Sequence, residues 1–174
     1  MKKALSALDS LEGGPGAWTF GGGTALAQIL SHRISYDVDI FLDSSTVLKN
    51  LAPNINPATK SLCDTWQWPG KHLKLILRDV GGIVFMNAPS YTDNPTYHLR
   101  LDDRFIPAER SAEIATKKLV YRASTYTARD TFDLAAIYLY DRSALGEIAQ
   151  SPAITDHVVS SALNRLILAK HQYQ

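Results

Sequence analysis

The chain has 174 residues and a mass of 19.2 kDa, which suits one domain with a sizeable core rather than two. Hydrophobic residues make up 45% of it and charged residues 20%, so we exclude a chain that is mainly disordered. Because 18 Lys and Arg nearly balance 17 Asp and Glu, we also exclude a general polyanion-binding protein, and any contact with nucleic acid has to be local.

Cysteine content and apolar runs indicate the compartment. Cys63 is the only cysteine, which excludes an intrachain disulfide and a zinc site built from several cysteines. The sequence has no apolar run long enough to cross a bilayer, and residues 1–10 lack the apolar core of a secretory signal. We therefore expect a cytoplasmic protein that has no membrane partner.

The first elements along the chain are a helix, a strand and a second helix. The first helix is predicted over residues 2–11 and ends at the glycine and proline cluster 13–16. Apolar residues 17–20 predict a short buried strand. Three glycines follow, and the apolar spacing after them predicts a helix capped by Thr24.

A second strand is predicted over residues 36–42, where Asp37 and Asp39 alternate with aliphatic residues. A period of two points both carboxylates to one side of the strand and the aliphatic side chains to the other. The strand therefore presents a pair of acids about 6 to 7 Å apart along the chain.

The remaining pattern consists of further strands and then helices. We expect one or two short helices in residues 44–64, broken at Pro53 and Pro57, then strands over 72–77, 83–86 and 97–101, and helices over 108–123, 128–140, 144–150 and 156–170. Strands followed by helices predict an α+β fold. We expect a single domain over residues 1–174, with a core of about residues 1–106 and a helical portion of about residues 107–174.

The glycine turn and the acidic strand together predict a site for metal and phosphate. Glycines between a strand and a helix let the backbone approach a ligand, and free N–H groups at a helix start attract phosphate oxygens. Two carboxylates on one strand face suit Mg²⁺, which binds oxygen ligands and bridges them to substrate phosphates. Later in the chain Lys118 and Arg122 share a helix face and offer positive charge. Taken one at a time, each pattern is also typical of a solvated surface.

Four segments in order narrow the interpretation: GGTAL, HRISYDVDIF, EIATKKLVYR and TARDTFDLA. They resemble the AbiEii/AbiGii toxin family of nucleotidyltransferases, within the DNA polymerase β-like nucleotidyltransferase superfamily. The resemblance covers residues 20–135. It implies a polymerase β-like core and an enzyme that transfers a nucleoside monophosphate from a nucleoside triphosphate to an acceptor hydroxyl.

The resemblance also implies site residues. Metal ligands for Mg²⁺ or Mn²⁺ are Asp37 and Asp39, which with Lys118 and Asp130 form the catalytic set. Nucleotide-binding positions are Gly22, Gly23, Thr24, Arg33, Ser35, Lys117, Arg122, Arg129 and Asp133.

Three assignments stay open at this point. The doubled lysine leaves Lys117 as an alternative to Lys118, and Asp130 either orients that lysine or helps to place the acceptor hydroxyl. The superfamily usually places a third carboxylate on a later strand, but residues 83–87 carry no acid, so the general base is unassigned.

The resemblance further implies a toxin of a toxin-antitoxin or phage-defence system, with tRNA or protein as acceptor and a cognate antitoxin as partner. An antibiotic-type enzyme that modifies a small molecule is an alternative, because the same acids would serve it. The absent third acid motivates another alternative, a nucleotide-binding or interaction module without turnover.

Overall fold

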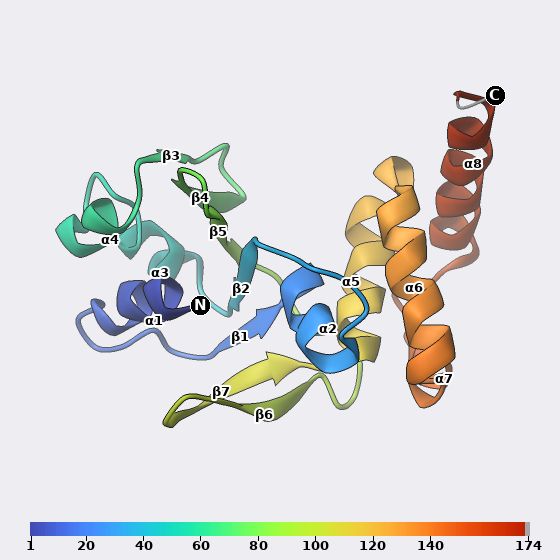
Figure 1. Cartoon of the computed structure of the whole chain (residues 1–174), viewed down its shortest axis with the longest axis horizontal. Coiled ribbons are helices and arrows are strands. Elements are labelled where there is room, and N and C mark those ends of the chain that lie inside the picture. The colour runs from blue at the N-terminus through green and yellow to red at the C-terminus, as the bar shows by residue number, and fades with distance from the viewer. Residues whose placement is uncertain (173–174) are drawn as a thin grey trace. The chain divides into compact units, whose positions relative to one another are not determined.

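The computed structural model describes residues 1–172 and confirms an α+β fold (Figure 1). Its seven-stranded mixed sheet has the order β3-β4-β5-β2-β1-β7-β6 within these residues. The strands are β1 (Trp18–Gly21), β2 (Val38–Leu42), β3 (Thr65–Gln67), β4 (His72–Leu77), β5 (Gly81–Asn87), β6 (Thr96–Leu101) and β7 (Arg104–Glu109). The helices are α1 (Lys2–Asp9), α2 (Gly22–Leu30), α3 (Ser45–Asn50), α4 (Pro57–Leu62), α5 (Ser111–Arg122), η1 (Ala123–Thr125), α6 (Ala128–Tyr140), α7 (Ser143–Gln150) and α8 (Asp156–Gln172).

The chain divides into two compact units. Unit 1 comprises Met1–Ala25, Ile34–Pro89 and Tyr97–Ala108, and unit 2 comprises Leu26–Arg33, Ser90–Thr96 and the chain from Glu109 onward. The first holds nearly all of the sheet and the second holds the late helices. A single nucleotidyltransferase domain over the whole chain stays a prediction.

In unit 1, β2 lies between β1 and β5. It pairs antiparallel with β1 and parallel with β5, and β5 pairs antiparallel with β4. Burial alternates along β4: Leu73, Leu75 and Leu77 are buried and the residues between them are half-buried. Helix α3 contacts β2 and β5. Burying one face of these strands fixes their register, because a slip by one residue would turn every side chain to the other face.

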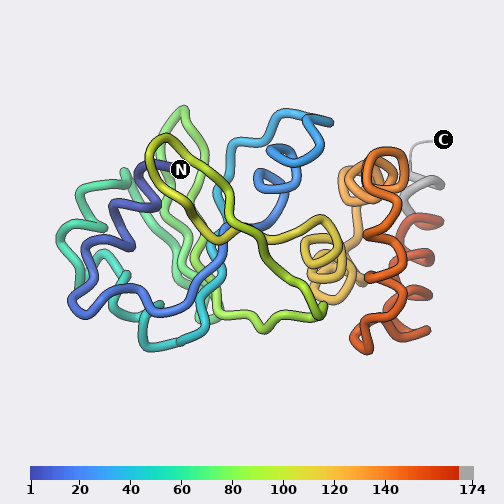
Figure 2. Tube along the Cα trace, turned by 90° about the horizontal axis from the view of Figure 1, so that it is seen from below, coloured from blue at the N-terminus to red at the C-terminus, as the bar shows by residue number. Residues whose placement is uncertain are grey.

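Strands β6 and β7 lie at the opposite edge of the sheet from β3 (Figure 1). The Cα trace of Figure 2 shows them as a hairpin, in yellow-green. The turn lies at Asp102, whose φ is +52°. The hairpin joins the sheet through β7, which pairs parallel with β1 at Phe20 and Ala108.

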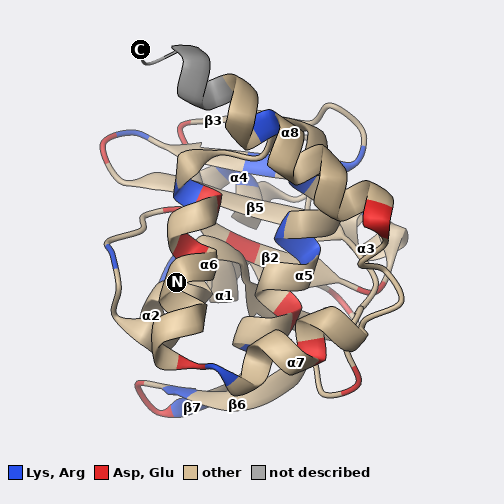
Figure 3. Cartoon of the chain, turned by 90° about the vertical axis from the view of Figure 1, so that its right-hand side faces the viewer, with Lys and Arg blue, Asp and Glu red and all other residues tan. Residues whose placement is uncertain are grey.

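In unit 2, α5 contacts α6, α7 and α8. Helices α5 and α6 carry charges of both signs (Figure 3). Ser111 to Lys117 are all buried, so the start of α5 is the best-covered part of the unit. Helix α6 begins with a capping box at Thr127.

Most sequence predictions match these elements, and three differ. Residues 104–109 form β7 where a helix from residue 108 was predicted, because pairing with β1 and β6 outweighs the local helical pattern. Thr24 does not cap α2, which begins at Gly22. The short strand β3 was not predicted, and it forms by pairing with β4.

Smaller differences concern the ends of elements. Helix α1 ends at Asp9, where Ser10 follows as its C-cap, rather than at residue 11. Strand β2 begins at Val38, so Asp37 lies directly before it. Pro57 opens α4 instead of ending a helix, since proline suits the first turn and Asn56 caps that turn by accepting a hydrogen bond from Thr59 N.

None of the helices in the described residues is long and apolar enough to cross a membrane.

Candidate active site

Asp39 lies beside the glycine turn that joins β1 to α2. Gly21 and Asp39 are paired across β1 and β2. Gly22 has a φ of +68°, and a Cβ placed on it would lie 1.9 Å from Asp39 Oδ2. Any side chain at residue 22 would be strained by the backbone and would collide with the carboxylate. The glycine therefore makes room for the acid as well as setting the turn.

Asp37 lies directly before β2 and is held by the start of β5, the strand that flanks β2 on the side away from β1. Its Oδ1 accepts a hydrogen bond of 2.8 Å from the backbone N–H of Gly82. Its backbone carbonyl oxygen accepts a hydrogen bond from the Thr24 hydroxyl, and Thr24 Oγ1 lies 2.8 Å from Ser35 Oγ. Thr24 and Ser35 thus fix the segment before β2 to the start of α2.

The two acids suit a divalent cation in chemical type. Asp37 is exposed and Asp39 is half-buried, and hard oxygen ligands are what Mg²⁺ and Mn²⁺ prefer. No group of three or more His, Cys, Asp or Glu side chains gathers as a metal site in the part of the chain that the structure describes. A metal held by Asp37 and Asp39 would therefore complete its coordination with water and with substrate oxygens, as Mg²⁺ usually does.

The strand next to the acids carries no carboxylate. Asp39 pairs with Val84 of β5, and directly paired residues project from the same face of a sheet. The position next to Asp39 on that face is thus aliphatic, so the general base stays unassigned.

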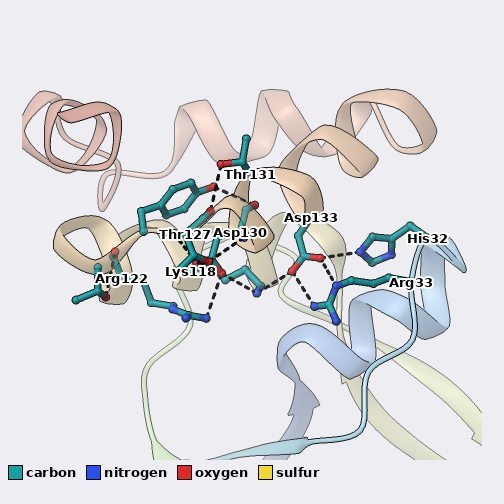
Figure 4. A network of polar contacts seen from close by, with 10 residues as sticks. His32, Arg33, Lys118, Arg122, Thr127, Asp130, Thr131 and Asp133 are labelled. Carbon is teal, nitrogen blue, oxygen red and sulfur yellow. Dashed lines mark hydrogen bonds and ion pairs between the residues drawn. The ribbon is translucent and has the colours of Figure 1, made fainter. Parts of the chain in front are cut away.

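The second group of predicted residues lies in unit 2 and centres on Lys118 (Figure 4). Lys118 Nζ lies 3.3 Å from Asp130 Oδ1 and 2.9 Å from Asp133 Oδ2. Its side chain is 13% exposed. Two buried carboxylates from one turn of α6 therefore hold this ammonium group in place while part of its surface stays open.

Both carboxylate oxygens of Asp130 are occupied. Oδ2 accepts hydrogen bonds from Thr127 N at 3.0 Å and Thr127 Oγ1 at 2.6 Å, completing the capping box of α6. Oδ1 contacts Lys118 and lies 3.1 Å from Arg122 Nη1. A carboxylate with this many donors is held in one orientation, which suits a role in positioning Lys118.

Asp133 joins the end of the α2 segment to α6. Arg33 donates from Nε to Oδ1 at 2.6 Å and from Nη2 to Oδ2 at 2.9 Å, and His32 Nε2 lies 2.7 Å from Oδ1. Burial by itself would raise the pKa of the Asp133 carboxyl, but hydrogen bonds from Arg33, His32 and Lys118 outweigh burial and hold that pKa well below its usual range. Asp133 is therefore a buried anion with three cationic or polar partners.

Lys117 points into a different cluster from Lys118. Its Nζ lies 2.5 Å from Glu109 Oε1 and 3.3 Å from Glu113 Oε1, and all three side chains are buried. Glu113 also accepts hydrogen bonds from Tyr91 N, Thr92 N and the Thr92 hydroxyl, so it ties the 90–96 segment to α5. This cluster is built as a structural anchor of unit 2.

The remaining predicted positions are the arginines of α5 and α6. Arg122 lies in the last turn of α5 and pairs with Asp130. Arg129 is exposed and has neither a hydrogen bond nor an ion pair to any residue that the structure describes. The structure thus gathers the predicted residues into two groups: Gly22, Gly23, Thr24, Ser35, Asp37 and Asp39 in unit 1, and Arg33, Lys117, Lys118, Arg122, Arg129, Asp130 and Asp133 in unit 2.

Sequence reasoning missed His32 and Thr127. The histidine lacks any metal-ligand spacing, and only the fold brings it to Asp133. Thr127 had a readable signal, since Thr-x-x-Asp ahead of an apolar helix is a variant of the capping-box pattern. The buried partners of Lys117, Glu109 and Glu113, were also missed, because carboxylates are rarely buried unless paired.

Replacing Asp133 by Asn should destabilise the protein by about 3–5 kcal/mol at pH 7, because Arg33 and Lys118 lose a buried counter-ion. Folding lowers the pKa of Asp133. The ionised carboxylate therefore stabilises the fold fully at a pH above the pKa that Asp133 has in the unfolded chain, and this stabilisation is lost progressively as the pH falls below about 4. Thermal melts should therefore show a difference between wild type and Asp133→Asn that shrinks from pH 7 to pH 3. The matched control is Glu147→Gln, an exposed change on α7. A difference that is independent of pH would contradict this account of Asp133.

Comparisons with known proteins give the fold and a family match to part of the chain. Residues 3–71 match the family model described as "Nucleotidyl transferase AbiEii toxin, Type IV TA system". A search of curated proteins finds no match to the chain. The family match contains the glycine turn and both acids, so the resemblance in the sequence is confirmed there, and the resemblance of residues 113–135 stays a prediction.

Three solved structures share the fold. MenT4, a nucleotidyltransferase toxin of Mycobacterium tuberculosis, is 17% identical with a TM-score of 0.54, over 84% of this chain and 60% of MenT4. An antigenic nucleotidyltransferase-like protein of Paracoccidioides brasiliensis is 16% identical with a TM-score of 0.54, over 98% and 88%.

The lincomycin-bound lincosamide antibiotic adenylyltransferase LnuA is 16% identical with a TM-score of 0.50, over 79% of this chain and 95% of LnuA. These likenesses show a nucleotidyltransferase fold, and the chain spans less than two thirds of MenT4. The chain therefore has a nucleotidyltransferase fold, and its residues 3–71 match the AbiEii toxin family model.

Proposed function

We propose that the chain transfers a nucleoside monophosphate from a nucleoside triphosphate to an acceptor hydroxyl and releases pyrophosphate. The acceptor oxygen bonds to the α-phosphorus, and the bond from that phosphorus to the oxygen that bridges the α- and β-phosphates breaks. The hydroxyl proton passes to a base. The observation that supports this most is Asp39 fitted against Gly22 in the turn between a strand and a helix.

Asp37 and Asp39 are the proposed ligands of Mg²⁺ or Mn²⁺. When bound, the ion would neutralise charge on the triphosphate and favour deprotonation of the attacking hydroxyl. The residues of the chain prepare for it: Gly82 N orients the Asp37 carboxylate, and Gly22 leaves room for the Asp39 carboxylate. The turn at Gly22, Gly23 and Thr24 is the proposed contact for the phosphates, through backbone N–H groups at the start of α2.

Lys118 is the proposed cation for the nucleotide's phosphates, and Asp130 and Asp133 are its positioning residues. This assignment is supported by the 13% exposure of Lys118 and by the full set of donors on both carboxylates. Lys117 is engaged by Glu109 and Glu113, which favours Lys118 of the two. Arg33 and Arg122 are proposed to act through Asp133 and Asp130.

The family description as a type IV toxin supports a toxin role with a cognate antitoxin as partner. The proposed acceptor is tRNA or protein. We expect both toxin and antitoxin in the cytoplasm. Local cations such as Arg129 would contact RNA phosphates, and such binding would weaken as salt rises.

One assay tests the function and identifies the acceptor. The protein is incubated with each of the four labelled nucleoside triphosphates, Mg²⁺ and total tRNA, and a gel separates labelled RNA from labelled protein. Label on RNA or protein supports the toxin proposal. A small-molecule acceptor would instead leave label on neither, with pyrophosphate released only when that molecule is added. If a triphosphate binds but releases no pyrophosphate with any acceptor, the chain is a module without turnover.

A further inference from the structure

Lys74 is a cation on the acid-bearing face of the unit 1 sheet that the resemblance did not assign. Asp39 of β2 pairs with Val84 of β5, and Val84 pairs with Lys74 of β4. Directly paired residues project from the same face, so these three side chains form one row across the sheet. The buried residues Leu73 and Leu75 on either side of Lys74 point to the opposite face.

The Lys74 stem is brought close to Asp37 by Gly82. A Cβ placed on Gly82 would lie 3.0 Å from Lys74 Cε and 3.1 Å from Asp37 Oδ1. Lys74 Cε and Asp37 Oδ1 are therefore no further apart than the two distances together, 6.1 Å. The ammonium nitrogen is one bond beyond Cε. Because Gly82 has no side chain, the stem of Lys74 and the carboxylate of Asp37 both reach the space beside it. The Gly82 N–H also orients that carboxylate.

Lys74 is half-buried, and it forms no ion pair with a residue that the structure describes. A long cationic side chain commonly buries its stem and leaves its charge accessible. Here the stem packs over a glycine beside the acid pair, and no carboxylate among the described residues pairs with the ammonium group and holds it away from a ligand. This placement of Lys74 favours binding of an anion on the face of the sheet where Asp37 and Asp39 lie.

We propose that Lys74 contacts a phosphate of the nucleoside triphosphate bound at Asp37 and Asp39. This inference rests on the proposed function. A triphosphate carries more negative charge than one divalent cation neutralises, and further fixed positive charge beside it stabilises the complex. The row that bears Asp39 continues through an aliphatic residue to a lysine, so this side of the site attracts phosphate where another acid would repel it.

The test measures the dissociation constant of each of the four nucleoside triphosphates with Mg²⁺ by equilibrium dialysis. With the triphosphate that wild type binds best, Lys74→Met should weaken binding about 10- to 100-fold, the range for a hydrogen bond to a charged group. Methionine keeps an unbranched stem over Gly82, so the fold should survive. Lys74→Arg should restore affinity to within about threefold. Lys60→Met, which removes an exposed charge from α4, is the matched control and should bind as wild type does.

A second readout separates phosphate contact from a structural role. Lys74→Met should lose affinity for the triphosphate while its affinity for the nucleoside without phosphates is unchanged, whereas a structural defect would weaken both. Equal triphosphate affinity in wild type and Lys74→Met would overturn this inference and leave the proposed function standing. Absence of triphosphate binding by wild type would overturn both.

Discussion

Asp39→Asn is expected to lower nucleotidyl transfer by at least about 100-fold while the melting temperature stays within a few degrees of wild type. The rate falls because an amide binds a divalent cation far less well than a carboxylate, and the charge that develops in transfer is then poorly stabilised. Stability is kept because Asn has nearly the shape of Asp and removes repulsion from Asp37. The rate is measured as pyrophosphate release in the presence of the nucleoside triphosphate and the acceptor, and the stability of the fold is measured by a thermal melt.

Asp37→Asn should behave in the same way, because the Asn side-chain oxygen still accepts the hydrogen bond from Gly82 N. Asp79→Asn is the matched control: Asp79 is an exposed carboxylate in unit 1 with a φ of +60°, a conformation that Asn adopts as readily as Asp. Wild-type rates in both active-site variants would remove these acids from the reaction, and a large rate loss in Asp79→Asn would show that the assay responds to any lost charge.

The adjacent lysines are expected to have opposite phenotypes. Lys118→Met should lower transfer by about 10²-fold with a modest loss of stability, because Asp130 and Asp133 keep Arg122, Arg33 and His32 as partners. Lys117→Met should instead lower stability by about 3–5 kcal/mol, since Glu109 and Glu113 are left buried without their cation. For a chain of this length that corresponds to a fall in melting temperature of about 10 °C.

Each variant serves as the control for the other, because both remove one lysine charge from α5. Activity is measured per folded molecule, at a temperature at which Lys117→Met is still folded. If Lys117→Met were the variant that lost activity, and Lys118→Met kept wild-type activity and stability, the functional assignment would shift to Lys117. Loss of both activity and stability in both variants would mean that the two clusters of unit 2 do not act separately.

The two adjacent lysines of α5 show how far a sequence pattern reaches. The sequence matched Lys118 to the family lysine but left Lys117 as an alternative, because a doubled residue has no unique register. The structure distinguishes them through their partners: one lies with Glu109 and Glu113 and the other with Asp130 and Asp133. Adjacent residues on a helix differ by about 100° around its axis, so the two side chains enter different surroundings.

Asp130 gives a similar lesson about roles. Its place after Arg129 in a helix start was readable, but the two roles considered for it were not separable from the sequence. The donors on both of its oxygens, two from Thr127 and two from the cations of α5, favour the positioning role. Such an assignment depends on counting hydrogen bonds, which only coordinates allow.

Local signals in the sequence were enough for the glycine turn, the acidic strand and the order of strands before helices, because hydrophobic period and glycine placement act between near neighbours. Strand β7, the His32 and Arg33 contacts with Asp133, and the row from Asp39 to Lys74 were decided only by the tertiary structure. Those features join residues far apart in the chain, and their energies come from pairing and burial that no short segment encodes.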